Sequence, residues 1–246
     1  MIMNQMAAAQ KFVAKPIVQQ KEKNSFTIEA VRKLPAYKLM KEMFGALIDG
    51  TETADVYGAT GSGKTFCAAV CFFEDNIYKK LGGDVRMLLS IPMCFATELV
   101  ANNVKQILDP ALSKLVGCAA RSRYTDNFQD SKLMIGTTEV ILRQIIACLH
   151  SKNPQIELQK IIVFIDETHH TSEQNYKLMW FCNYLRGKSY ALRVVKMSAT
   201  PPDASEQIHL TPQRTFSVPV RTFKVTEHYI QRDVYNRSDI SLYRLD

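Results

Sequence analysis

An eight-residue loop rich in glycine carries the first group of residues that could do chemistry. It has the sequence GATGSGKT and consists of Gly58, Ala59, Thr60, Gly61, Ser62, Gly63, Lys64 and Thr65. Glycines let the backbone turn tightly and expose N–H groups, which bind phosphate oxygens together with the positive end of a following helix. We expect Lys64 to reach the β- and γ-phosphate oxygens and the Thr65 hydroxyl to ligate Mg²⁺. The loop therefore predicts a nucleoside triphosphate site.

A pair of acidic residues, Asp166 and Glu167, forms the second group. It follows IIVFI, an apolar run typical of a strand buried on both faces. Two adjacent carboxylates at the end of such a strand are costly to leave unpaired, so we expect a cation there. Asp166 is the candidate ligand of Mg²⁺, and Glu167 is the candidate to orient and deprotonate an attacking water molecule. Together with Lys64, the pair predicts a catalytic centre for phosphate hydrolysis.

Two histidines, His169 and His170, come directly after these carboxylates. Adjacent histidines on one segment point apart, and no third ligand has a suitable spacing, so the pattern does not predict a zinc site. We expect His169 to join the catalytic group by relaying hydrogen bonds between the carboxylates and the segment Ser198, Ala199 and Thr200. Hydroxyl groups in that segment can bond either to the histidine or to the facing backbone.

The elements that must position these residues alternate along the chain. Strands are expected at 53–57, 84–91, 132–135, 160–165 and 192–197, and helices near 63–79, 94–108, 138–149 and 172–186. This alternation predicts an α/β fold with a doubly wound, mostly parallel sheet covered on both faces. Ligands bind beyond the carboxyl ends of strands in such sheets, and both candidate segments fall there. Before them, residues 26–48 read as one kinked helix or two short helices with a break at Pro35.

Composition narrows the class of protein. The chain has 246 residues, of which 46% are hydrophobic and 22% are charged, and these values exclude a disordered or collagen-like chain. The longest apolar run has eight residues, whereas a membrane span needs about 20, so we predict no membrane-spanning segment. Six cysteines without a CxxC pair favour free thiols in a reducing, cytoplasmic location. A net charge of +7 permits a polyanionic partner without establishing one.

The order of three motifs carries a family resemblance. GATGSGKT, DETH and KMSATPP resemble motifs I, II and III of superfamily 2 DExH helicases. IDETH with SATPP is most similar to helicases of positive-strand RNA viruses, particularly the potyvirus cylindrical inclusion type. The resemblance covers about residues 45–225 and implies a RecA-like fold of the P-loop NTPase type, with ATP or another NTP and Mg²⁺ as ligands. It also implies that Ser198, Ala199 and Thr200 couple hydrolysis to strand movement.

Contacts to single-stranded RNA follow from the same resemblance. Pro92 fits the frame of motif Ia, and Gly136, Thr137 and Thr138 fall where motif Ib contacts RNA phosphates. Met93 and Cys94 stand where motif Ia usually has Thr-Arg. Trp180 and Phe181, which could stack on bases, are expected in the core because Leu178 and Met179 precede them.

The resemblance divides the chain into three parts. Residues 1–25 read as a flexible basic tail, with a nucleic-acid-binding arm as the alternative. Residues 26–210 correspond to the first RecA-like helicase domain, and residues 211–246 to a connection toward a second RecA-like domain, with strand-like alternation over 215–225. The arginine-rich QxxGRxGR motif of that second domain does not occur in the sequence. We therefore expect either a fragment or a partner domain on another polypeptide, and slow hydrolysis by these residues alone.

The leading hypothesis is Mg²⁺-dependent NTP hydrolysis by the first motor domain of an RNA helicase. A nucleotide-switched interaction module of a replication complex is one alternative, and a DNA translocase subunit, which would share every motif, is another.

Overall fold

The computed structural model describes residues 27–120, 123–125, 130–169, 172–201 and 211–218. The predicted tail over 1–25 and the part of the predicted connection beyond 218 lie outside these ranges.

An eight-stranded sheet forms the centre of the described structure, with the strand order β4-β3-β5-β2-β6-β7-β1-β8. Neighbouring strands pair in parallel, except β3 and β4, which are antiparallel. The strands are β1 (Thr53–Tyr57), β2 (Arg86–Ile91), β3 (Val116–Ala120), β4 (Arg123–Tyr124), β5 (Leu133–Thr137), β6 (Ile161–Ile165), β7 (Arg193–Ser198) and β8 (Arg214–Ser217). The predicted α/β fold with a mostly parallel sheet is confirmed.

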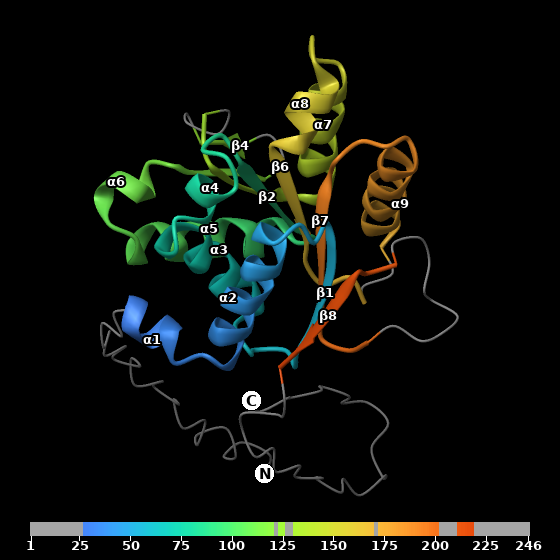
Figure 1. Cartoon of the computed structure of the whole chain (residues 1–246). Helices are drawn as coiled ribbons and strands as arrows, with labels where there is room; N and C mark the ends of the chain where they lie inside the picture. The colour runs from blue at the N-terminus through green and yellow to red at the C-terminus, as the bar shows by residue number, and fades with distance from the viewer. Residues whose placement is uncertain (1–26, 121–122, 126–129, 170–171, 202–210, 219–246) are drawn as a thin grey trace, which may run out of the picture.

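Helices cover both faces of the sheet (Figure 1). One group is α1 (Ile28–Arg32), α2 (Pro35–Ile48), α3 (Lys64–Glu74), α4 (Ile77–Lys80), α5 (Cys94–Ile107) and α6 (Pro110–Ser113). The other is α7 (Thr138–Leu149), α8 (Pro154–Gln159) and α9 (Glu173–Gly187). Each group packs its own apolar layer on the sheet, because alternate residues of a strand point to opposite faces.

Strand β6 shows how the two layers meet. All five of its residues are buried, with Ile162 and Phe164 in the layer under the first helix group and Ile161, Val163 and Ile165 in the layer under the second. A strand that is apolar on both faces belongs in the middle of a covered parallel sheet. This placement brings the residues that follow β6 to the centre of the carboxyl edge.

The helical segment before the sheet has the break that Pro35 predicted. Helix α1 ends at Arg32, and Pro35 is the first residue of α2, where its missing N–H has no helical partner to lose. The predicted helix over 63–79 is likewise two helices, α3 and α4, because the chain turns at Asn76 with φ of 50°.

One element was missed by the predictions, and one expectation about a side chain is wrong. Strand β3 was not predicted, because its sequence VGCAA has small residues in place of the β-branched and aromatic residues typical of strands. Trp180 is not in the core: 49% of it is exposed, and its ring stacks on Tyr184 at 5.6 Å between centroids. Helix α9 turns Leu178, Cys182 and Leu185 to the sheet instead.

Strand β8 lies within the segment predicted as a connection. It pairs in parallel with β1, so residues 214–217 form the edge of the same sheet.

All six cysteines are free, and four of them are buried. None of the helices in the described ranges combines the length and apolar character that a membrane span requires.

Candidate active site

The loop from Gly58 to Thr65 leaves β1 at its carboxyl end and enters α3. Gly63 caps the helix with φ of 84°, and a Cβ atom there would lie 2.7 Å from the Leu34 Cδ1 atom. A Cβ atom at Gly58 would lie 2.9 Å from the Val218 Cγ2 atom. Glycine is therefore favoured at Gly63 by the left-handed backbone conformation and at Gly58 by the close approach of Val218.

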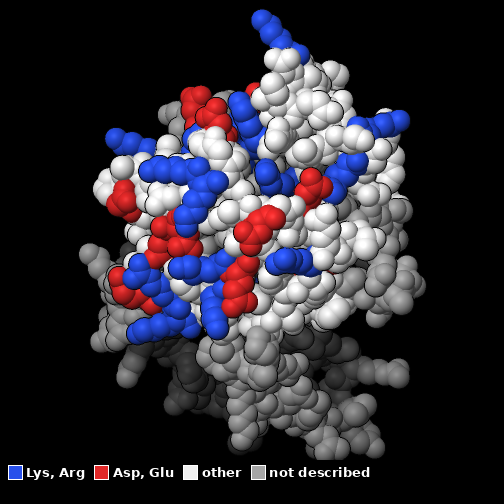
Figure 2. Space-filling model, in the orientation of Figure 1, with Lys and Arg blue, Asp and Glu red and all other residues white. Residues whose placement is uncertain are grey.

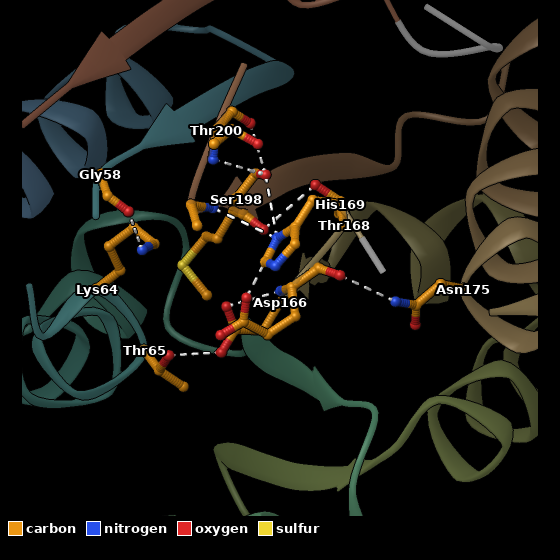
Figure 3. A network of polar contacts seen from close by, with 12 residues as sticks. Gly58, Lys64, Thr65, Asp166, Thr168, His169, Asn175, Ser198 and Thr200 are labelled. Atoms are coloured by element: carbon orange, nitrogen blue, oxygen red, sulfur yellow. Dashed lines mark hydrogen bonds and ion pairs between the residues drawn. The ribbon is translucent and has the colours of Figure 1, made fainter. Parts of the chain in front are cut away.

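Lys64 is folded back on the loop that precedes it. Its Nζ atom donates hydrogen bonds to the carbonyl oxygens of Gly58 at 2.5 Å and Ala59 at 3.3 Å (Figure 3). Only 5% of the residue is exposed, and this burial lowers its pKa although the charges of Asp166 and Glu167 oppose the shift. The ammonium group therefore lies inside the loop, where bound phosphates would also have to lie.

Ser62 supplies a second polar group inside the loop. The residue is 2% exposed, and its Oγ atom has no hydrogen-bond partner among the described residues. A buried hydroxyl without a partner is unfavourable and is rare in native structures. A phosphate oxygen would accept the proton of this hydroxyl, so the orphaned group fits the predicted ligand.

Thr65 joins the loop to the acidic pair at the end of β6. Its hydroxyl donates a hydrogen bond to the Asp166 Oδ2 atom at 2.5 Å, although the two residues are about a hundred positions apart. Asp166 is 3% exposed, and burial raises its pKa to about 6. Glu167 adds to this shift by like-charge repulsion, whereas the hydrogen bond from Thr65 opposes it.

The oxygen atoms of Thr65 and Asp166 fit a magnesium site. Mg²⁺ prefers hard oxygen ligands and is usually held by one or two carboxylates together with substrate phosphates and water. No cluster of three or more His, Cys, Asp or Glu residues that could hold a metal occurs in the described ranges. The described residues thus suit an ion shared with a phosphate ligand better than one enclosed by protein ligands alone.

Glu167 has a backbone conformation that is rare for its residue type. Its φ is 52°, which lies in the left-handed region, and its N–H donates to the Asp166 Oδ1 atom at 2.9 Å. The Glu167 carbonyl oxygen accepts a hydrogen bond from the Asn175 Nδ2 atom at 3.3 Å (Figure 3). Next along the chain, the Thr168 N–H donates to the Met197 carbonyl oxygen at 3.0 Å, which anchors the segment on β7.

His169 lies between the acidic pair and the end of β7. Its Nδ1 atom is 3.3 Å from the Glu167 Oε2 atom and 3.3 Å from the Ser198 Oγ atom, and the Ala199 N–H donates to it at 3.4 Å. The Ser198 hydroxyl also donates to the Thr200 carbonyl oxygen at 2.7 Å. These contacts join the same groups as the predicted relay, and the catalytic role of His169 stays a prediction.

The loop and the segment after β7 are also in direct contact. The Gly58 N–H donates to the Ser198 carbonyl oxygen at 3.1 Å. Strands β1 and β7 are neighbours in the sheet, so their carboxyl ends lie side by side. The structure thus brings together the three motif segments that the sequence placed far apart.

The residues predicted to contact RNA differ in exposure. Gly136 is buried, and Thr138 is 3% exposed with its hydroxyl bonded to Ser90 and Asn175 inside the protein. The Thr138 hydroxyl faces inward, and the contact of Gly136 and Thr138 with RNA phosphates stays a prediction. Pro92 and Thr137 are half-buried at the carboxyl edge, and their role stays a prediction.

Charge on the surface does not mark a nucleic-acid groove on the face in view. Figure 2 shows Lys and Arg side chains interspersed with Asp and Glu over helices α1 to α6. Several of them are paired, as in Lys41 with Asp75 at 3.1 Å. Within the described part of this face, the excess positive charge forms no large patch of one sign.

Asn175 is the residue of this site that sequence reasoning missed. It lies in the first turn of α9, where Ser172 caps the helix by accepting a hydrogen bond from the Asn175 N–H at 3.2 Å. An asparagine near a helix start usually reads as a surface or capping residue. In the structure, Asn175 is completely buried, and its side-chain amide bonds to the Glu167 carbonyl.

Comparison with known proteins agrees with this arrangement. DExH-box ATP-dependent RNA helicase DExH1 of Arabidopsis thaliana is 26% identical over 89% of this chain and 22% of its own length. ATP-dependent RNA helicase DHX30 of Homo sapiens is 25% identical over 72% of this chain, and putative ATP-dependent RNA helicase YLR419W of Saccharomyces cerevisiae is 24% identical over 86%. The chain spans 14% of the length of each of these two relatives. Residues 36–208, more than half of the chain, match the family described as DEAD/DEAH box helicase, and they include all three motif segments. The chain therefore belongs to the DEAD/DEAH box helicase family.

Proposed function

We propose that the chain is the first motor domain of an ATP-dependent RNA helicase and that it binds and hydrolyses ATP in the presence of Mg²⁺. The observation that carries the proposal is the contact between the Thr65 hydroxyl and the Asp166 carboxylate at 2.5 Å. This contact unites a loop suited to phosphates with an acidic pair suited to a cation and a water molecule. Family membership and the names of the relatives support the same activity.

The loop from Gly58 to Thr65 would bind the triphosphate. Its backbone N–H groups and the start of α3 favour negative charge, and the Ser62 hydroxyl has a proton to donate. Lys64 would exchange its bonds to the Gly58 and Ala59 carbonyls for bonds to phosphate oxygens. Thr65 and Asp166 would hold Mg²⁺, which neutralises phosphate charge when bound.

Hydrolysis would depend on Glu167 as the general base. Its side chain is one-third exposed, which leaves room for a water molecule to reach it. His169 contacts this carboxylate and the Ser198 hydroxyl, so it would orient the base. Through the Gly58 N–H, the end of β7 also contacts the phosphate loop, and we propose that this is how Ser198, Ala199 and Thr200 couple hydrolysis to movement.

A second RecA-like domain, in cis or in trans, completes the proposal. Arginines supplied to the γ-phosphate accelerate comparable reactions by about 10³ to 10⁵, so turnover by these residues alone would be slow. The resemblance of IDETH and SATPP to viral helicases supports single-stranded RNA as the substrate and replication of a positive-strand RNA genome as the setting. The free cysteines support a reducing, cytoplasmic location.

Two substitutions and matched controls test the proposal. Lys64→Ala should abolish ATP binding measured by titration calorimetry, because it removes the charge inside the loop. Glu167→Gln should keep binding and stop phosphate release, because it removes the base. Lys80→Ala and Glu173→Gln change exposed residues and should leave both quantities unchanged. Wild-type turnover in Lys64→Ala and Glu167→Gln would contradict the proposal.

The nucleic-acid part of the proposal has its own test. RNA should stimulate turnover more than DNA of the same sequence, and a stronger effect of DNA would favour a DNA translocase. Nucleotide-dependent capture of proteins without turnover would favour an interaction module. RNA affinity should fall with salt by a log-log slope of about −0.7 for each phosphate contact, and a flat response would remove the case for binding through phosphates.

A further inference from the structure

We propose that Asn175 is a positioning residue that holds the backbone of Glu167 and links it to the start of α7. A buried chain of hydrogen bonds carries the inference. The Ser90 hydroxyl donates to the Thr138 Oγ1 atom at 3.0 Å, and the Thr138 hydroxyl donates to the Asn175 Oδ1 atom at 2.9 Å. The Asn175 Nδ2 atom then donates to the Glu167 carbonyl oxygen at 3.3 Å.

The residues that form these hydrogen bonds are buried, so the bonds hold them in one arrangement. Ser90 and Asn175 are 0% exposed and Thr138 is 3% exposed, so water cannot replace a partner that moves away. A buried polar chain in which each member has a partner fixes one arrangement, whereas a broken chain leaves an unsatisfied group. The Asn175 amide uses its oxygen toward α7 and its nitrogen toward Glu167, so one side chain connects the two segments.

The conformation of Glu167 explains why such support is needed. Its φ of 52° is unfavourable for a residue with a Cβ atom, and such conformations persist where neighbouring contacts determine them. Three contacts do so here: the Glu167 N–H is bonded to Asp166, its carbonyl is bonded to Asn175, and the N–H of the next residue, Thr168, is bonded to the Met197 carbonyl. If the contact with Asn175 were lost, the peptide between Glu167 and Thr168 would keep the bond of its N–H to Met197 but lose the bond at its carbonyl, so it could tilt and carry the Glu167 carboxylate with it.

The location of Thr138 means that the chain of hydrogen bonds links the start of α7 to Glu167. Thr138 is the first residue of α7 and comes directly after β5, beside the half-buried Thr137 at the carboxyl edge. A shift of the start of α7 would therefore change the hydrogen bond to Asn175 and, through it, the position of Glu167. The inference rests on the proposed function for the role of Glu167 as the base, but the hydrogen-bonded contacts themselves do not.

Two variants and a matched control test the proposal. Asn175→Leu keeps the approximate size of the side chain and removes both hydrogen bonds, and Thr138→Val removes the bond from α7 alone. Thr97→Val is the control, because Thr97 is also a buried threonine on a helix, and among the described residues its hydroxyl bonds only to the Met93 carbonyl at 2.9 Å. Thr138→Ser restores the hydroxyl and should restore the wild-type behaviour.

Hydrogen exchange of the whole chain without nucleotide gives the first readout. In Asn175→Leu, exchange of the Glu167 and Thr168 amides should be at least about tenfold faster, while that of the β6 amides stays within twofold. Thr138→Val should show a smaller increase at the same amides, and Thr97→Val should show none. Unchanged exchange at Glu167 and Thr168, or an equal increase throughout β6, would overturn the proposal.

Turnover gives the second readout. Asn175→Leu and Thr138→Val should lower kcat by about tenfold and about threefold, with KM for ATP within twofold of the wild type. The double variant should be no worse than Asn175→Leu, because both act through one chain of bonds. Equal losses in kcat and in ATP affinity would overturn the positioning role. Absence of turnover in the wild type would refute the proposed function, while the exchange result would still decide the inference.

Discussion

Helices α5 and α7 begin at the same edge of the sheet, yet their first turns are built in opposite ways. Each follows one of two neighbouring parallel strands, β2 or β5. Around the start of α5, Met93, Phe95 and Leu99 are 63%, 75% and 49% exposed. At the start of α7, Thr138 and Val140 are at most 4% exposed.

This difference shows that the position of a helix start at the carboxyl edge of the sheet does not by itself indicate whether its residues face a ligand or the protein interior. Pro92, just before α5, and Gly136, Thr137 and Thr138, around the start of α7, were predicted to contact RNA because both segments match motif positions of the same resemblance. The start of α7 faces the protein and connects to Asn175, whereas the start of α5 presents large apolar side chains to solvent. Exposed apolar groups that cluster beside a site often mark a contact surface. We therefore expect the α5 start to affect ligands and the α7 start to affect the site itself.

The largest expected effect concerns the packing of α7 on β5. A Cβ atom at Gly136 would lie 3.1 Å from the Ile141 Cδ1 atom and 3.3 Å from the Val140 Cγ1 atom. Gly136→Val should therefore lower the free energy of unfolding by about 3 kcal/mol because of overpacking, measured by urea denaturation. Gly45→Ala is the matched control, since a Cβ atom there meets nothing within 4 Å, and it should raise stability by about 0.5 to 1 kcal/mol. Equal effects of the two changes would mean that α7 is not tightly packed there.

The next effect concerns the buried carboxylate of Asp166, the residue that follows β6 and whose backbone N–H is bonded to the Ser90 carbonyl at 3.0 Å. Burial raises the pKa of Asp166 to about 6, so the folded protein binds this proton more tightly than the unfolded chain. The stability that protonation adds is present below the usual pKa of 3.8 and is lost as pH rises through about 6. Asp166→Asn should therefore raise the free energy of unfolding at pH 8 by about 2 kcal/mol, measured in EDTA without nucleotide.

A pH series separates this explanation from a general gain in stability. The difference between Asp166→Asn and the wild type should shrink as the pH falls from 8 to 4. A difference that is constant over this range would show that ionisation of Asp166 is not its cause.

A smaller effect tests the exposed start of α5. Phe95→Ala should weaken binding of single-stranded RNA by about tenfold, because base stacking on an aromatic ring contributes about 1 to 3 kcal/mol. The variant should unfold at the same urea concentration as the wild type, since the side chain is mostly exposed. Thr138→Val should leave RNA affinity unchanged when measured by fluorescence anisotropy. A larger loss of RNA affinity in Thr138→Val than in Phe95→Ala would mean that the start of α7, and not that of α5, contacts RNA.

The smallest effect lies on the outer face of α7. Arg143 and Glu139 form an exposed ion pair four residues apart, with 67% and 64% of their side chains accessible. Such pairs contribute little, so Arg143→Ala should change the free energy of unfolding by less than about 0.5 kcal/mol. A larger loss in denaturation experiments would mean that the outer face of α7 contributes more than its exposure indicates.

Much of the fold followed from sequence because strong local signals coincide with buried elements. The apolar run over 161–165 and the glycines before α3 each fit few kinds of local structure. The structure has the first as strand β6 and the second as the loop after β1, as expected. Strand β3 escaped prediction because Gly117, Cys118 and Ala119 have no strong preference for strands, and only the sheet around them determines their conformation.

The site was predictable to a similar extent. Phosphate-loop and acidic residues have a fixed spacing relative to their own strands, so the sequence indicated that they would meet. Asn175 has no such signal, because its contact with Glu167 depends on how α9 packs against the sheet. The inward orientation of the Thr138 hydroxyl was not predictable for a related reason: a threonine at a helix start looks the same in sequence whether its hydroxyl faces solvent or the interior.

The close approach of Val218 to Gly58 limits how the chain can be shortened. Val218 donates its N–H to the Tyr57 carbonyl at 2.8 Å, and its side chain fills the space beside the first glycine of the phosphate loop. A polypeptide cut at residue 210, the boundary suggested by resemblance alone, would lose β8 and this neighbour together. Trimming at that point would leave the nucleotide loop without one of its walls, so a usable minimal domain has to extend at least through residue 218.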